Sequence, residues 1–187
     1  MQALTAFKAY DVRGRIPDEL NETLVYDIGR AYAAFVRPKR VVVGRDIRLT
    51  SAALAESLTR GLLDCGVDVA DIGLCGTEGV YYATAAGDGA GGVFDGGIMV
   101  TASHNPPDYN GLKFVREGAR PISAETGLRE MAALIGAGDL PGAPLRGGAR
   151  GTVRHLDVRE RYTAHLLEYV DRAALRPLKV EIGRAHV

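Results

Sequence analysis

Hydrophobic positions along this chain follow two different periods. Recurrence every three to four residues predicts amphipathic helices, and short continuous or alternating runs predict strands. A first helix is expected to begin at Asn21 and to end at Pro38. Further helices are expected from Thr50 or Ser51 to 62 and over 79–86, 124–135 and 157–170. Strands are expected over 40–44, 66–73 and 97–100, with an extended segment over 6–14 and an apolar stretch over 112–115.

The alternation of strands and helices predicts an α/β fold. We expect a three-layer α/β/α domain with a mixed sheet of about four strands and helices on both faces, followed by a linker helix. Residues 136–151 are rich in Gly, Pro and Ala and are expected to form an exposed linker. We therefore expect one domain over 1–152, and the linker helix with the truncated start of a second domain over 153–187.

The final run, residues 181–187, departs from the apolar strand that residues 179–180 begin to build. One codon choice for this run spells the opening of a widely used sequencing adapter. We therefore expect residues 181–187 not to be native. A clone of the locus that ends with the same seven codons would contradict this interpretation.

Composition and charge narrow the function classes. The 23 basic and 23 acidic side chains cancel, so no long-range field attracts nucleic acid or an anionic membrane. No apolar run approaches the roughly 18 residues of a transmembrane helix, and the first residues lack the pattern of a signal peptide. We expect a cytoplasmic protein. Cys65 and Cys75 show no zinc-ligand spacing and are expected to be reduced, buried thiols.

Residues 97–113 hold the densest set of reactive side chains. The strand over 97–100 leads into Thr-Ala-Ser-His-Asn-Pro-Pro-Asp-Tyr-Asn-Gly-Leu-Lys over 101–113, a long turn-rich loop. This places Ser103 beyond the end of a strand, where open α/β sheets bind ligands, with His104 beside it and Lys113 ten positions on. A connector in which Ser103 only caps a turn is the plain alternative. The number of reactive groups favours a site.

The run over 101–113 resembles the active-site serine loop of the α-D-phosphohexomutases, in their bacterial phosphomannomutase/phosphoglucomutase branch. A second run, Ala-Tyr-Asp-Val-Arg-Gly over 9–14, resembles another motif of that branch. The related phosphoglucosamine mutases typically open with a Gly-Thr-Asp-Gly motif instead, and an enzyme of that kind is an alternative. The resemblance covers roughly residues 6–180, about one of the family's four domains.

The resemblance implies an isomerase that interconverts hexose 1-phosphate and hexose 6-phosphate. Ser103 is implied as the phosphoserine that donates phosphate, with a hexose 1,6-bisphosphate as intermediate and activator. Phosphoryl transfer depends on positioning and charge neutralisation, and a planar arginine fork suits phosphate. The implied catalytic residues are Ser103, His104, Lys113 and Arg13, and the implied substrate contacts are Tyr10, Arg13 and Asn110. Asn105 and Asn110 are also expected to fix the loop.

The resemblance also implies a magnesium ion, bound by the Ser103 phosphate and by three aspartates of an Asp-x-Asp-x-Asp loop in the second domain. That loop is absent from this sequence. A phosphorylated hexose is the expected partner. We expect the chain alone to lack mutase turnover.

Two other hypotheses about the function compete with the phosphohexomutase interpretation. A hydrolase that uses Ser103 and His104 is disfavoured, because triad partners normally come from distant segments and no Gly-x-Ser-x-Gly elbow surrounds the serine. A non-catalytic phosphosugar-binding domain is the second alternative.

The glycine-rich stretch 87–97 lacks a nucleotide-binding motif and is expected to be a flexible connector. The run 45–48 is expected to be a structural ion-pair cluster of Arg45, Asp46 and Arg48, and His155 and His165 are expected on a helix surface.

Overall fold

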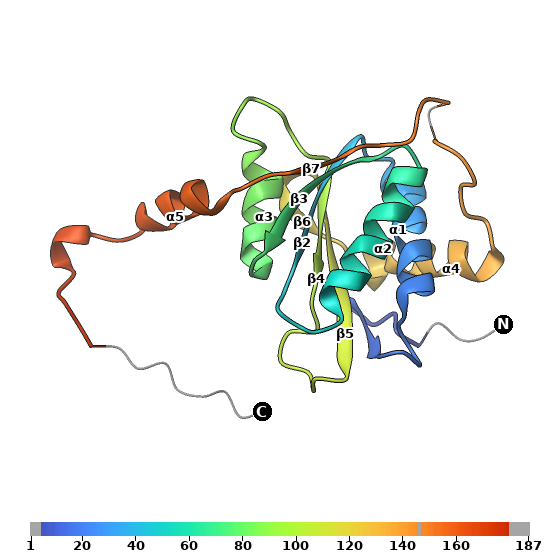
Figure 1. The fold of residues 1–187 in the computed structure, drawn as a ribbon, viewed down its shortest axis with the longest axis horizontal. Coiled ribbons are helices and arrows are strands. Elements are labelled where there is room, and N and C mark those ends of the chain that lie inside the picture. The colour runs from blue at the N-terminus through green and yellow to red at the C-terminus, as the bar shows by residue number, and fades with distance from the viewer. Residues whose placement is uncertain (1–4, 146, 180–187) are drawn as a thin grey trace.

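A mixed sheet of seven strands forms the centre of the fold (Figure 1). The computed structural model describes residues 5–145 and 147–179, so the expectation about residues 181–187 lies outside the described residues. The strand order is β1-β5-β4-β2-β3-β7, with β6 paired to β5. The strands are β1 (Val12–Arg15), β2 (Arg40–Arg45), β3 (Asp68–Leu74), β4 (Gly96–Val100), β5 (Tyr109–Arg116), β6 (Arg120–Pro121) and β7 (Val153–His155).

The predicted α/β class with a mixed sheet is confirmed, but the expected number of about four strands was wrong. The additional strands β6 and β7 are two and three residues long and exposed. Segments of this length are too short to show an apolar or alternating run. Pairing with a neighbouring strand, rather than burial of their own side chains, holds them in the sheet. β7 lies beyond the expected domain boundary at 152 and pairs in parallel with β3.

Strand direction decides which loops meet. β2 runs parallel to both β3 and β4, whereas β5 runs antiparallel to β4 and β1. Because the carboxyl ends of parallel neighbours lie at one edge of a sheet, the loops that follow β2 and β4 lie side by side. A backbone hydrogen bond of 3.0 Å from Asp46 to Val100 joins them directly.

Helices cover both faces of the sheet. In Figure 1, α1 (Glu22–Val36) and α2 (Ser51–Asp64) lie on one side and α3 (Thr77–Ala86) lies on the other. α1 begins as predicted, because the Asn21 side chain accepts a 3.0 Å hydrogen bond from the Leu24 amide. α1 and α2 pack closely: a Cβ on Gly61 would lie 2.2 Å from the Tyr26 carbonyl oxygen. That position therefore requires glycine.

Alternation along the strands divides the core between the two faces. Ile98 and Val100 of β4 belong to the cluster under α1 and α2, and Met99 packs in the cluster under α3. Leu112 and Phe114 of β5 join the first cluster. Lys113 between them therefore points to the α3 face, the same face as Met99, its register partner.

The expected helix over 124–135 has a different start. A π-helical turn, η2 (Ala124–Leu128), precedes α4 (Arg129–Ala137). Gly127 has φ of 152° there, and a Cβ at this position would lie 2.4 Å from the Phe35 ring. The turn bends the chain so that it fits against α1. The remaining short turns are η1 (Glu117–Ala119) and η3 (Arg172–Ala174).

The segment after β7 leaves the body of the domain in Figure 1. Its helix α5 (Arg159–Leu167) is shorter than the expected 157–170. It contacts α3 through aromatic rings: the centroid of His165 lies 5.1 Å from that of Tyr82, and His155 lies exposed on β7 rather than on a helix. Across the described ranges, none of the helices has the length and hydrophobicity needed to cross a bilayer.

The glycine-rich connector is more ordered than we expected. The Asp88 carboxylate accepts hydrogen bonds from the amides of Ala90 and Gly92 at 2.9 and 2.8 Å. The other carboxylate oxygen, Oδ2, pairs with Arg40 of β2 and with Arg154 of β7, each at 2.8 Å. This carboxylate therefore joins the connector to two strands.

Candidate active site

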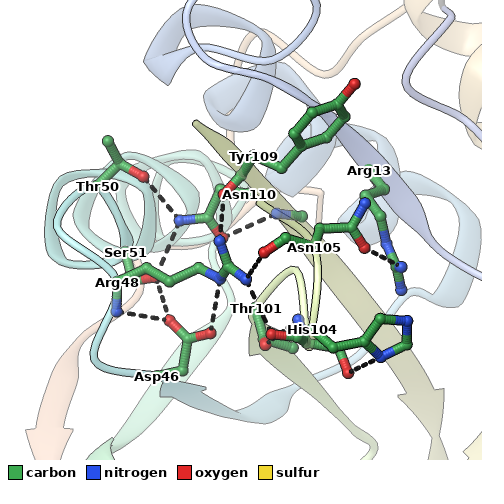
Figure 2. A network of polar contacts seen from close by, with 12 residues as sticks. Arg13, Asp46, Arg48, Thr50, Ser51, Thr101, His104, Asn105, Tyr109 and Asn110 are labelled. Atoms are coloured by element: carbon green, nitrogen blue, oxygen red, sulfur yellow. Dashed lines mark hydrogen bonds and ion pairs between the residues drawn. The ribbon is translucent and has the colours of Figure 1, made fainter. Parts of the chain in front are cut away.

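The serine loop, residues 101–108, leaves the carboxyl end of β4 and returns as β5. Its neighbour is the loop over 46–50 between β2 and α2, as Figure 2 shows. The first residue of the loop, Thr101, is still bonded to β5, because its amide donates a 2.9 Å hydrogen bond to the Gly111 carbonyl. The structure thus places the predicted reactive segment beyond the end of a strand.

Ser103 lies exposed in this loop in a left-handed conformation, with φ of 57°. Residues with a Cβ rarely adopt this conformation, and such outliers gather at functional sites. The Ser103 amide donates to the Thr101 hydroxyl at 2.8 Å. Its own hydroxyl lies 3.4 Å from Nδ1 of His104. The hydroxyl therefore faces solvent with one weak partner.

Two cations meet at one carboxylate near the loop. Arg13 of β1 and Lys113 of β5 both contact the same Asp11 oxygen, at 2.6 and 3.3 Å. Asp11 is 8% exposed, and a nearly buried carboxylate needs such partners. Sequence reasoning missed Asp11, although it lies between Tyr10 and Arg13 in the second motif.

Arg13 also joins β1 to the serine loop. Its Nη1 donates a 2.5 Å hydrogen bond to the side-chain oxygen of Asn105 (Figure 2). Its Nε is buried and has no hydrogen-bond partner in the described chain. Arg13 is therefore brought together with Asn105 and, through Asp11, with Lys113, although both lie far from it in the sequence. Asn105 holds the loop, as the sequence analysis expected.

Asn110 lies on the opposite side of β5 from Lys113. It is fully buried, and its amide nitrogen donates to the hydroxyls of Thr50 and Ser51 at 2.8 and 2.9 Å. This is the expected loop-fixing role. The side chain has no exposed surface, and the expected substrate contact at Asn110 stays a prediction. Tyr10, the other candidate beside Arg13, is 79% exposed.

The ion-pair cluster expected after β2 is present only in part. Arg48 lies 3.6 Å from Asp46, but Arg45 pairs with no described acidic residue. The two terminal nitrogens of Arg48 instead donate to four carbonyl oxygens of the serine loop and its end: Ser103 at 2.9 Å, Asn105 at 2.6 Å, Pro106 at 2.8 Å and Tyr109 at 3.0 Å. Sequence reasoning missed this role, which no spacing rule indicates.

The pair of Ser103 and His104 does not form a hydrolase site. Their separation of 3.4 Å is long for a hydrogen bond. No residue of the described chain orients the other ring nitrogen of His104, whereas a nucleophile's base is normally held by a third group. The exposed serine with nearby cations suits an anionic group, such as a phosphate, better than it suits acyl transfer.

Comparison with known proteins agrees with this geometry. Residues 4–139 match the profile of phosphoglucomutase/phosphomannomutase, alpha/beta/alpha domain I. A phosphomannomutase of Salmonella typhimurium is 56% identical over 180 residues, which are 96% of this chain and 38% of that protein. A phosphomannomutase sequence of Klebsiella pneumoniae is 53% identical over 171 residues, 91% of this chain and all of that sequence.

Solved structures show the same likeness. A phosphoglucomutase/phosphomannomutase family protein of Burkholderia thailandensis superposes with a TM-score of 0.80 at 35% identity, covering 91% of this chain and 37% of that one. For a protein of Thermus thermophilus described as a phosphomannomutase the TM-score is 0.72 at 29% identity, with 90% and 36% covered. The chain therefore spans less than two fifths of these longer relatives.

Proposed function

The chain belongs to the phosphoglucomutase/phosphomannomutase family, and from this premise we propose that it is the N-terminal part of a longer phosphohexomutase. That enzyme interconverts hexose 1-phosphate and hexose 6-phosphate. The observation that carries the proposal is the exposed Ser103 in a loop whose Asn105 accepts a hydrogen bond from Arg13, one of two cations joined at Asp11. The relatives named above support the class of substrate, a phosphorylated hexose.

In the proposed reaction, phosphoserine 103 gives its phosphoryl group to the free hydroxyl of a hexose monophosphate. The bond from Ser103 Oγ to phosphorus breaks, a bond from the sugar oxygen to phosphorus forms, and a proton passes from the sugar hydroxyl to Ser103 Oγ. The resulting hexose 1,6-bisphosphate reorients and returns its other phosphoryl group to Ser103. Arg13 and Lys113 balance the charge, and Lys113 or His104 assists the proton transfer.

Magnesium is part of the proposal, but the side chains that the structure describes do not complete a site for it. Within the described ranges, no group of three or more His, Cys, Asp or Glu side chains could hold a metal ion. Asp11 is already paired with two cations. A phosphate on Ser103 would supply hard oxygen ligands, which magnesium prefers, and the remaining ligands have to come from elsewhere. Bound magnesium would neutralise phosphate charge.

The first test is intact mass with peptide mapping of the longer protein, purified under mild conditions. We expect an adduct of about 80 Da, one phosphate, on the peptide that contains Ser103, and none in Ser103→Ala. If Ser103 carries no phosphate and cannot be charged by a hexose 1,6-bisphosphate, the proposal fails. A phosphosugar-binding domain without catalysis would then be the better description.

We also propose that the 187 residues alone do not turn over substrate. They hold the phosphate donor without a complete set of metal ligands among the described residues. The check is a coupled assay of the purified chain with mannose and glucose 1-phosphate and added magnesium. Sustained formation of the 6-phosphate would contradict this, provided that Ser103→Ala purified in parallel is inactive.

A further inference from the structure

The guanidinium of Arg48 lies against the serine loop (Figure 2), and all of its terminal donors are in use. Its Nη1 donates to the carbonyls of Pro106 and Tyr109, and its Nη2 donates to those of Ser103 and Asn105. These carbonyls span the whole loop from its reactive residue to the start of β5. One side chain therefore contacts the loop backbone at four carbonyls.

Only an arginine can make this contact set. Its planar fork presents five N–H donors in fixed directions, whereas a lysine has three donors on one atom. The side chain is only 14% exposed, so water does not readily replace a lost bond. A lysine at this position would leave at least one loop carbonyl without its partner.

The clamp is fixed to the body of the domain. Asp46 pairs with the Arg48 side chain and accepts hydrogen bonds from the Arg48 amide and the Ser51 hydroxyl, at 3.0 and 2.6 Å. Ser51 is the first residue of α2 and is fully buried. Arg48 therefore links the serine loop, through Asp46, to the first residue of α2.

We propose that Arg48 is a positioning residue for phosphoryl transfer, which holds Ser103 in its left-handed conformation so that Oγ points in one direction. The proposal rests on the proposed function. Ser103 keeps a φ of 57° through bonds on both sides of the residue, since its amide donates to Thr101 and its carbonyl accepts from Arg48. In-line transfer depends on such placement, and a shift of about 1 Å commonly costs about a hundredfold in rate.

The experiment has two parts. In the 187-residue chain, hydrogen exchange of the Asn105 and Tyr109 amides, which donate to Ala102 and Pro106, is compared between the native chain and Arg48→Ala. In the longer protein, kcat and KM are measured for Arg48→Ala and Arg48→Lys, with and without added guanidinium. Arg60→Ala is the matched control, because Arg60 donates to Ser57 inside α2.

We expect both loop amides to exchange at least about tenfold faster in Arg48→Ala, while amides of β2 are unchanged. We expect kcat to fall about a hundredfold with little change in KM. Millimolar guanidinium should restore part of kcat in Arg48→Ala, but sodium chloride should not. Arg48→Lys should stay impaired, since charge alone is insufficient. Arg60→Ala should resemble the native protein in every measurement.

Two results would overturn the proposal. Unchanged loop exchange in Arg48→Ala would show that the clamp does not hold the loop. Faster exchange with unchanged kcat would show that loop position does not matter for transfer. Failure of the proposed function is distinct: Ser103 of the native longer protein would then accept no phosphate, while the exchange measurement would still report on the clamp.

Discussion

The Arg13 guanidinium donates a 2.5 Å hydrogen bond to the side-chain oxygen of Asn105, across 92 positions of sequence. This contact joins the first strand to the serine loop. It fixes the arginine against the serine loop, at a residue two positions after Ser103. The two sequence motifs therefore form one site.

A double-mutant cycle on this contact should show coupling. We expect Arg13→Ala and Asn105→Ala to have a coupling free energy of about 1 kcal/mol in the unfolding of the chain. Either substitution alone removes the hydrogen bond, so the double variant loses less stability than the sum of the two single variants. Urea unfolding of the two single variants and the double variant measures it. Arg13→Ala combined with Asp68→Ala should be additive, since Asp68 lies on β3, several strands away.

Asp11→Asn should weaken both fold and function. It removes the charge that pairs with Arg13 and Lys113, and we expect the free energy of unfolding to fall by about 2 kcal/mol. Transfer from Ser103 in the longer protein should also slow, since both cations lose their anchor. Asp18→Asn, at an exposed carboxylate, is the control. Native stability in Asp11→Asn would mean that the carboxylate does not organise the two cations.

Asn110→Ala tests the structural role of a buried amide. We expect the free energy of unfolding to fall by about 1–3 kcal/mol, because the variant loses the hydrogen bonds that Asn110 donates to Thr50 and Ser51. Thermal unfolding measures this. KM for the hexose phosphate should be unchanged. A large rise in KM without a loss of stability would instead support the substrate contact that the family resemblance implies.

Asp88 should make the domain sensitive to acid. Hydrogen bonds from Arg40 and then Arg154 hold the pKa of the Asp88 carboxyl below its usual value of about 3.9. The folded state thus binds the proton less readily than the unfolded state, so this stabilisation is complete above about pH 4 and is lost as the pH falls below it. Asp88→Asn should be less stable than the native chain at pH 7. The difference should narrow on titration to pH 3, whereas a constant difference would exclude this linkage.

The two thiols should be unreactive in the folded chain. Burial raises the pKa of both Cys65 and Cys75 to about 11, so little thiolate is present at neutral pH, and the thiolate is the reactive form. We expect a thiol-specific reagent such as DTNB to label both slowly in the native chain and rapidly in urea. Fast labelling of Cys75, the less buried of the two, would show that its site opens.

Much of this protein could be predicted from local patterns. The helix that begins at Asn21 was predicted because an asparagine before apolar residues at helical spacing is a local signal. The placement of Ser103 beyond a strand was predicted because the buried run of β4 and the prolines after it are neighbours in sequence. The family resemblance also rested on continuous runs, and the comparison with relatives confirmed it.

Only the tertiary structure decided the remaining features. Strands β6 and β7 are too short to show a period, and only their partners keep them in the sheet. Asp11 gained its role because β1 and β5 pair and bring Lys113 to it. Arg48 became the clamp of the serine loop because β2 and β4 run parallel and end at the same edge. The residues of the loop could be predicted from sequence, but the partners that hold it depend on strand pairing, which brings together segments that are distant along the chain.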